Sequence, residues 1–147
     1  MRTLVRDLGN AAGSRQATSV ETAHLREFFA RRVLHMEVDD YILRKYRRHV
    51  QDDLHWPEDT TPEEYLESLR ATILDPGSRI YLTIEHDRYE WTICFVGPVR
   101  RAWRGPDGSD RIAVLFNGER HFFITGFQPT SSDAYIDRQG GFWRQQR

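Results

Sequence analysis

The sequence has few of the residues that define several protein classes. Its 147 residues include one cysteine, Cys94, which excludes a disulfide framework and a multi-thiolate zinc site. No stretch approaches the 18 apolar residues that a membrane span needs, and the first ten residues lack the apolar run of a secretory signal. We therefore expect a soluble, cytoplasmic domain without a membrane partner, and delivery by a dedicated secretion machine is compatible with this expectation.

Short catalytic and binding signatures are also missing. The sequence contains no C-x-x-C, H-E-x-x-H or EF-hand pattern, which predicts no metal site. It contains no G-x-G-x-x-G, Walker A or G-x-S-x-G pattern, so nucleotide cofactors and serine hydrolases have no support. We expect a protein that works without a metal or a cofactor.

Lysine is nearly absent. Lys45 is the one lysine among 21 Lys and Arg residues, which face 22 Asp and Glu residues for a net charge of −1. This balance argues against a broad, nonspecific grip on duplex nucleic acid. The charge divides unevenly, with −3 over residues 1–75 and +2 over residues 76–147. Codon use in a GC-rich genome is one explanation for the excess of arginine over lysine. A functional explanation is that planar guanidinium groups bind phosphates in two-point contacts. The positive charge of residues 76–147 favours an anionic ligand on that half.

Helical signals dominate the first half of the chain. Thr18 and Glu21 fit a capping box that opens an amphipathic helix. A second helical stripe follows a cap at Asp39 or Asp40 and runs to Val50. Another capping box then opens the clearest helix of the sequence, at Thr61-Pro62-Glu63-Glu64, and Asp75-Pro76-Gly77 ends it.

Strand signals follow after Pro76. Four short runs rich in β-branched and aromatic residues cover 79–86, 91–96, 111–116 and 121–127, and Asn117-Gly118 is a hairpin turn signal. The sequence predicts an α+β fold in which N-terminal helices pack on a curved antiparallel β-sheet of about four strands. We expect a loosely ordered N-terminal arm over 1–17 and a single domain over 18–147. In that domain, helices cover about 18–75, the sheet about 79–128, and a C-terminal tail 129–147.

Two residues stand out as candidates for chemistry. His49 lies at the border of a buried helical stripe, and the neighbouring Arg48 would lower its proton affinity, which suits a general base near neutral pH. Thr125 precedes Gly126 near the end of the last predicted strand, where a hydroxyl and a backbone N–H could hold a phosphate oxygen. Each residue also has an ordinary structural interpretation, because histidines at helix borders and threonines in strands are common.

Three further residues could bind an anionic substrate. Arg79 opens the first predicted strand, and Arg101 belongs to a basic cluster before the glycine-rich turn at 105–108. Strand alternation would place His121 on the same face as Thr125. A helix-borne histidine, a strand threonine and one or more arginines that converge on a sheet would form a phosphoryl-transfer site without a metal.

The order of these motifs resembles a known group of nucleases. Arg48-His49 at a helix end, then Ile73-Leu74-Asp75-Pro76, then a strand ending in Ile124-Thr125-Gly126-Phe127, is similar to metal-independent nucleases of the barnase–EndoU–colicin–RelE superfamily, in particular its phage-associated and polymorphic-toxin members. The resemblance covers about residues 45–129. It implies an endoribonuclease with RNA as substrate, with His49 as acid and base and Thr125 near the scissile phosphate.

The sequence leaves other functions open. A toxin of this type would have an antitoxin or immunity protein as partner. A non-catalytic binding module, either an immunity-type or a phage accessory protein, is the main alternative, and a transferase acting on a nucleotide is another. The net charge of −1 and the absence of lysine from the sheet depart from the clearly basic character of many nucleic-acid-cleaving toxins. A basic cleft containing both His49 and Thr125 would favour the nuclease.

Overall fold

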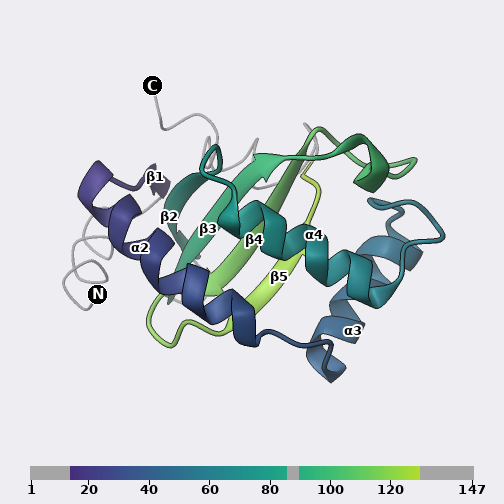
Figure 1. Cartoon of the computed structure of the whole chain (residues 1–147), viewed down its shortest axis with the longest axis horizontal. Coiled ribbons are helices and arrows are strands. Elements are labelled where there is room, and N and C mark those ends of the chain that lie inside the picture. The colour runs from purple at the N-terminus through teal and green to yellow at the C-terminus, as the bar shows by residue number, and fades with distance from the viewer. Residues whose placement is uncertain (1–13, 86–89, 130–147) are drawn as a thin grey trace.

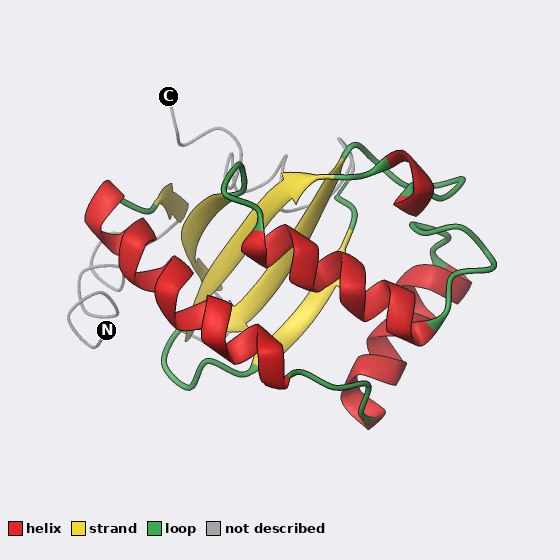
Figure 2. Cartoon of the chain, in the orientation of Figure 1, coloured by secondary structure: helices red, strands yellow, loops and turns green. Residues whose placement is uncertain are grey.

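The fold has two layers, with helices packed on one face of an antiparallel sheet (Figures 1 and 2). The computed structural model describes residues 14–85 and 90–129, so most of the predicted arm and nearly all of the predicted tail lie outside the described residues. Five strands follow one another as a meander in the order β1-β2-β3-β4-β5, and each neighbouring pair is antiparallel. The predicted α+β architecture is confirmed.

Four of the strands correspond to the four predicted runs. They are β2 (Arg79–Glu85), β3 (Glu90–Pro98), β4 (Arg111–Asn117) and β5 (Phe123–Phe127). The fifth is β1 (Ser14–Gln16), which pairs with Tyr81–Thr83 of β2. The end of the predicted loose arm is therefore part of the sheet. The three polar residues of β1 show no alternation typical of a strand. They join the sheet because the edge of β2 offers unpaired backbone groups.

Two long helices begin as the sequence predicts. In α2 (Ser19–Arg32), the Thr18 N–H donates to Glu21 Oε1 at 2.8 Å and the Glu21 N–H donates to Thr18 Oγ1 at 3.3 Å. In α4 (Pro62–Leu74), Thr61 and Glu64 form the same reciprocal pair after which Pro62 starts the helix. These capping boxes satisfy N–H groups that a helix start leaves unpaired, so the two helix starts are determined locally.

The second predicted helix divides into two parts. Asp39 caps α3 (Asp40–Tyr46), and its Oδ1 accepts a hydrogen bond from the Ile42 N–H at 2.8 Å. The chain then widens into a π-helical turn, η2 (Arg47–Asp52), in which the Asp53 N–H donates to the carbonyl of Arg48 five residues earlier. Turns of this kind are rare and are frequent at functional sites.

The main core lies between the helices and one face of the sheet. Phe29 of α2 and Leu69 of α4 are fully buried there, and Phe29 contacts the rings of Phe95 and Phe116. The sheet contributes every second residue of its central strands to this core, as pleating requires. The opposite face carries a second buried cluster, whose members are Tyr81, Cys94, Val96, Ala113, Leu115 and Phe127.

The β4–β5 connection differs from the prediction. Instead of a two-residue hairpin, the Asn117 side chain accepts hydrogen bonds from the N–H groups of Glu119 and Arg120, and five residues separate the strands. His121 has a φ of 66° and precedes β5, so it does not continue the strand. The prediction that His121 shares a strand face with Thr125 is therefore wrong, because side-chain capping by Asn117 competes with ladder pairing.

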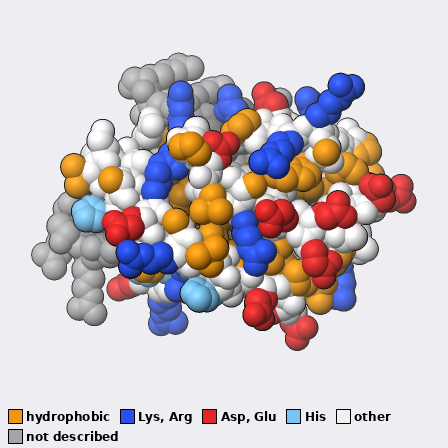
Figure 3. All heavy atoms as spheres, in the orientation of Figure 1, with side chains coloured by type: hydrophobic (Ala, Val, Ile, Leu, Met, Phe, Trp, Pro, Cys, Tyr) orange, Lys and Arg blue, Asp and Glu red, His pale blue; other side chains and the backbone are white. Residues whose placement is uncertain are grey.

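The charged side chains on the helical face are mixed in sign, and acidic groups gather over α4 and α3 (Figure 3). This agrees with the net negative charge of the helical half of the sequence. Among the described residues, no helix combines the length and the apolar character needed to cross a membrane.

Candidate functional site

The candidate site lies where α3, η2 and α4 meet the edge strand β5. An edge strand presents unpaired backbone groups that a protein must cover. The Tyr41 hydroxyl donates to the carbonyl of Ile124 at 2.8 Å, and the Tyr65 hydroxyl donates to the carbonyl of Gly126 at 2.7 Å. These two bonds hold the helices against β5 on both sides of Thr125. The edge carbonyls are satisfied, and Thr125 is held at a defined position.

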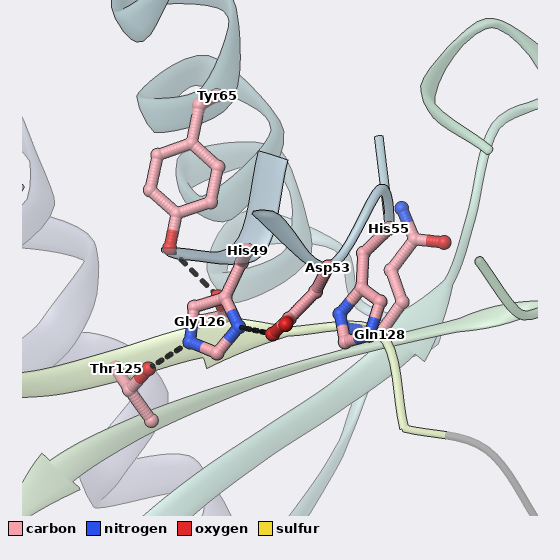
Figure 4. A network of polar contacts seen from close by, with 7 residues as sticks. All are labelled: His49, Asp53, His55, Tyr65, Thr125, Gly126 and Gln128. Atoms are coloured by element: carbon pink, nitrogen blue, oxygen red, sulfur yellow. Dashed lines mark hydrogen bonds and ion pairs between the residues drawn. The ribbon is translucent and has the colours of Figure 1, made fainter. Parts of the chain in front are cut away.

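His49 and Thr125 are in direct contact. His49 Nε2 lies 2.9 Å from Thr125 Oγ1, although 76 residues separate them in the sequence. His49 Nδ1 lies 3.2 Å from Asp53 Oδ2 on its other side. Figure 4 shows the three side chains in line, with the imidazole between the carboxylate and the hydroxyl. A carboxylate accepts only from an N–H, so neutral His49 carries its proton on Nδ1 and accepts the Thr125 O–H at Nε2.

The environment of His49 favours the neutral imidazole. Its side chain is 9% exposed, whereas that of Asp53 is 41% exposed. Burial is the largest cause that lowers the pKa of His49 from 6.5 to about 4, and the nearby His55 also lowers it. Asp53 raises this pKa, and Arg48 lowers it by a smaller amount than burial does. The predicted effect of Arg48 therefore has the right direction, but desolvation is the main cause.

His55 is a second imidazole at the site, and no sequence pattern points to it. Its ring stacks on that of His49 with the centroids 5.7 Å apart and the planes 19° from parallel. The backbone N–H of Gln128 donates to His55 Nδ1 at 3.2 Å. Neutral His55 therefore carries its proton on Nε2, which makes that atom a hydrogen-bond donor.

The backbone around His55 is unusual. Leu54 has a φ of 55°, a conformation that a leucine rarely adopts and that costs free energy unless the surroundings impose it. The His55 N–H donates to the carbonyl of His49 at 2.9 Å, and the carbonyl of Leu54 accepts from the Asp107 N–H at 3.0 Å. These contacts from both sides hold the turn that brings the two imidazoles together.

The glycine-rich turn at 105–108 supports the same region. A Cβ atom at Gly105 would lie 2.3 Å from the carbonyl oxygen of Trp56, so only glycine allows this close backbone approach. Gln128, which is fully buried, accepts from the Ser109 N–H at 2.9 Å and donates to the carbonyl of Trp103 at 2.7 Å. The turn and Gln128 together fix the segment on which His55 rests.

The donor atoms of His49, Asp53 and His55 lie within 4.8 Å of one another, which raises the question of a metal site. The lone pair of an imidazole nitrogen lies in the ring plane, and a metal requires lone pairs that converge at about 2.0–2.1 Å. Two nearly parallel stacked rings do not aim their lone pairs at one point. His55 Nδ1 also already accepts from Gln128. The geometry therefore fits a hydrogen-bonded relay better than a metal site.

The other predicted site residues lie at different places in the fold. Arg48 is exposed and adjoins His49 on η2. Arg79 of β2 lies in a row of paired residues that crosses the sheet and ends at Phe127 of β5. Three strand spacings separate Arg79 from Phe127, which corresponds to about 14 Å. Arg101 is exposed in η3 (Arg101–Trp103). His121 packs against Phe28 and Phe29, away from Thr125.

Asp53 and His55 were missed because they lie in a polar stretch without a period. A usable signal for Asp53 exists, since a residue four positions after His49 shares its helix face. No equivalent signal points to His55, whose position depends on the left-handed turn at Leu54.

Comparisons with protein-family models, with curated proteins and with solved structures find no match to this chain.

Proposed function

We propose that this protein is a metal-independent endoribonuclease that cleaves RNA by attack of a 2′-hydroxyl on the neighbouring phosphate. The observation that carries the proposal is the linear arrangement Asp53–His49–Thr125, with a neutral imidazole 2.9 Å from a hydroxyl oxygen. An imidazole nitrogen that accepts a hydrogen bond from one hydroxyl can accept a hydrogen bond from a different hydroxyl in the same position. A general base needs this reach to the proton that it removes.

In the proposed reaction, the 2′-hydroxyl of RNA replaces the Thr125 hydroxyl as the donor to His49 Nε2. His49 takes the proton, and Asp53 stabilises the resulting imidazolium through Nδ1–H. The 2′-oxygen forms a bond to phosphorus, and the bond from phosphorus to the 5′-oxygen breaks. The departing oxygen takes a proton from water, and His49 returns its proton to solvent. The products are a 2′,3′-cyclic phosphate and a 5′-hydroxyl.

The remaining groups would stabilise the charge that develops on the phosphate. The displaced Thr125 hydroxyl is free to donate to a non-bridging oxygen. His55 would serve the same purpose through Nε2–H, because the Gln128 N–H occupies Nδ1 and leaves the proton of the neutral ring on Nε2. Arg48, exposed beside His49, would supply a positive charge to the phosphate.

The low pKa of His49 is compatible with this role. With a pKa of about 4, the base is unprotonated throughout the neutral range. A bound phosphodiester places a negative charge near the imidazole, and a nearby negative charge raises the pKa of a histidine. The base thus becomes stronger when the substrate is present.

A non-catalytic binding module is the second candidate. The observation that favours it is the burial of His49, which is 7% exposed and has a hydrogen-bond partner at each ring nitrogen. A purely structural histidine has these properties too. In that case the wild-type protein would leave RNA intact, and substitution of His49 would change stability alone.

The chemistry of the substrate tests the proposal. The wild-type protein is incubated in EDTA with an oligoribonucleotide and with matched oligonucleotides that carry a single 2′-deoxy position. We expect cleavage products that end in a 2′,3′-cyclic phosphate, and no cleavage at the 2′-deoxy position. RNA that stays intact at micromolar protein, or cleavage that ignores the 2′-deoxy substitution, would overturn the proposal.

A further inference from the structure

A groove among the described residues is separate from the site described above. It has a volume of about 850 Å³ and lies between the end of α2, the segment leading to α3, and the start of β5. Its walls are mainly aromatic and its rims are charged. The residues that line it are Phe28, Arg31, Arg32, His35, Met36, Glu37, Asp39, Tyr41, Ile42, Phe116, Phe122 and Phe123.

Two aromatic rings at the groove remain open to solvent. Phe28 is 41% exposed and Phe122 is 45% exposed. Phe28 is held from behind by the ring of Phe29, with the centroids 5.1 Å apart, and by that of His121 at 4.7 Å. A large exposed aromatic ring in a fixed position loses little conformational entropy when a flat ligand stacks on it.

The charges on the two rims are of opposite sign. Arg31, Arg32 and His35 lie on the α2 side, and Arg31 also contacts Glu27 at 3.2 Å. Glu37 and Asp39 lie on the segment that leads to α3. A nucleotide matches this arrangement, because its phosphate is anionic while the ring and exocyclic N–H groups of its base donate to carboxylates. A purely apolar peptide segment would leave both rims without partners.

The groove adjoins the candidate site through Tyr41 and β5. Tyr41 lines the groove, and its hydroxyl donates to the carbonyl of Ile124, the residue before Thr125. Phe123 on the groove floor is two residues from Thr125, a distance of about 7 Å along a strand. An RNA strand with its scissile phosphate at Thr125 could thus reach the groove with a neighbouring nucleotide.

We propose that this groove binds one unpaired nucleotide of the RNA strand beside the scissile phosphate. The base stacks on Phe28 and Phe122, and the phosphate faces Arg31 and Arg32. This inference rests on RNA being the substrate. Unpaired bases stacked on aromatic side chains are the usual means by which proteins bind single-stranded RNA.

Binding of an uncleavable strand tests the groove separately from catalysis. The probe is a fluorescent 2′-O-methyl oligoribonucleotide of six residues, which has no 2′-hydroxyl to attack, and binding is followed by anisotropy. We expect Phe122→Ala to weaken binding about 5- to 100-fold, as expected for the loss of one stacked base. Phe28→Leu, which keeps the apolar volume without an aromatic face, should also weaken binding.

Leu34→Ala is the matched control. Leu34 is 73% exposed near the groove but does not line it, so its substitution should leave the affinity unchanged. The wild type should bind an abasic oligonucleotide of the same length more weakly than it binds the probe. The wild type and the two Phe variants should bind this abasic oligonucleotide with equal affinity. Thermal unfolding confirms that each variant is folded.

Two results would overturn the inference. One is a wild-type protein that does not bind the probe at tens of micromolar. The other is a Phe122→Ala protein that binds as tightly as Leu34→Ala, which would instead favour a protein partner at the groove. The two proposals can also fail separately. If the wild type does not cleave RNA but Phe122→Ala weakens binding as expected, the catalytic proposal is rejected and the groove assignment stands.

Discussion

At the scale of single residues, Asp53 controls the orientation of His49. Its carboxylate lies 3.2 Å from Nδ1 and raises the pKa of the imidazole against the effect of burial. We expect Asp53→Asn to lower kcat/KM about 10- to 100-fold, because misplacement of a catalytic group by about 1 Å has an effect of this size. The pKa of His49 should also fall below about 4.

The pH dependence of kcat/KM measures both effects, because its acidic limb reports the base of the free enzyme. In the wild type this limb should lie near pH 4, and in Asp53→Asn it should move lower. An acidic limb that moves upward in the variant would contradict the assigned role of Asp53.

Substitutions and mass spectrometry distinguish two chemical roles for the Thr125 hydroxyl, that of a donor to the phosphate, which we propose, and that of a nucleophile. As the proposed donor to the phosphate, its hydroxyl should contribute about 10²- to 10³-fold to the rate, the usual effect of a single donor that stabilises a developing charge. Thr125→Val should therefore be slowed by about this factor, and Thr125→Ser should retain most of the activity. Mass spectrometry of the enzyme during turnover should show no adduct. A covalent adduct on Thr125 would instead identify it as a nucleophile.

At the scale of elements, the turn at 105–108 positions His55 through backbone contacts alone. A Cβ atom at residue 105 would lie 2.3 Å from the Trp56 carbonyl oxygen and 2.4 Å from that of Leu54, and backbone atoms cannot move aside easily. We expect Gly105→Ala to cost about 1–3 kcal/mol of unfolding free energy, as overpacking usually does. The cleavage rate should also fall because the His55 turn shifts.

Gly77→Ala is the control for this substitution. A Cβ atom there would approach only the side chain of the half-buried Asp75, with Oδ1 at 3.2 Å and Cγ at 3.9 Å. Urea unfolding should show a small effect at Gly77 and a large one at Gly105. Equal stability of the two variants would mean that the turn does not hold the segment from Leu54 to Trp56.

The elements that the sequence predicts well are those determined locally. The capping boxes at Thr18 and Thr61 need only residues three positions apart, and both are present in the structure. The contact between His49 and Thr125 was expected only as a convergence of two candidates, because it depends on how α3 and η2 cover the edge of β5. The π-helical turn and the left-handed Leu54 leave no pattern in the sequence. For that reason His55 was missed. His121 was assigned to a strand that it does not join because the Asn117 side chain caps the connection before β5.

At the scale of the whole molecule, the buried His49 makes stability depend on pH. Its pKa is about 4 in the folded protein and about 6.5 in the unfolded chain. Between these values the unfolded chain binds a proton that the folded protein does not, so unfolding free energy is lost as the pH falls from 6.5 to 4. The loss amounts to up to about 3 kcal/mol, from 1.36 kcal/mol per pKa unit.

Urea unfolding at pH 7 and pH 4 measures this loss in the wild type and in His49→Gln. The variant has no proton to bind at this position, so its stability should fall less between the two pH values. His121 has a pKa lowered chiefly by burial and adds a smaller loss of the same sign to both proteins. Identical pH dependence of the two proteins would show that His49 is not buried as a neutral base.

The central claim is that His49 removes the 2′-hydroxyl proton of RNA. The most direct measurement is the cleavage rate of an oligoribonucleotide in EDTA by His49→Gln, compared with the wild type and with His24→Gln, whose histidine is exposed on α2. We expect His49→Gln to be about 10²- to 10⁴-fold slower than the wild type, the usual contribution of a general base, and His24→Gln to be unchanged. A folded His49→Gln protein that cleaves RNA at the wild-type rate would contradict the account.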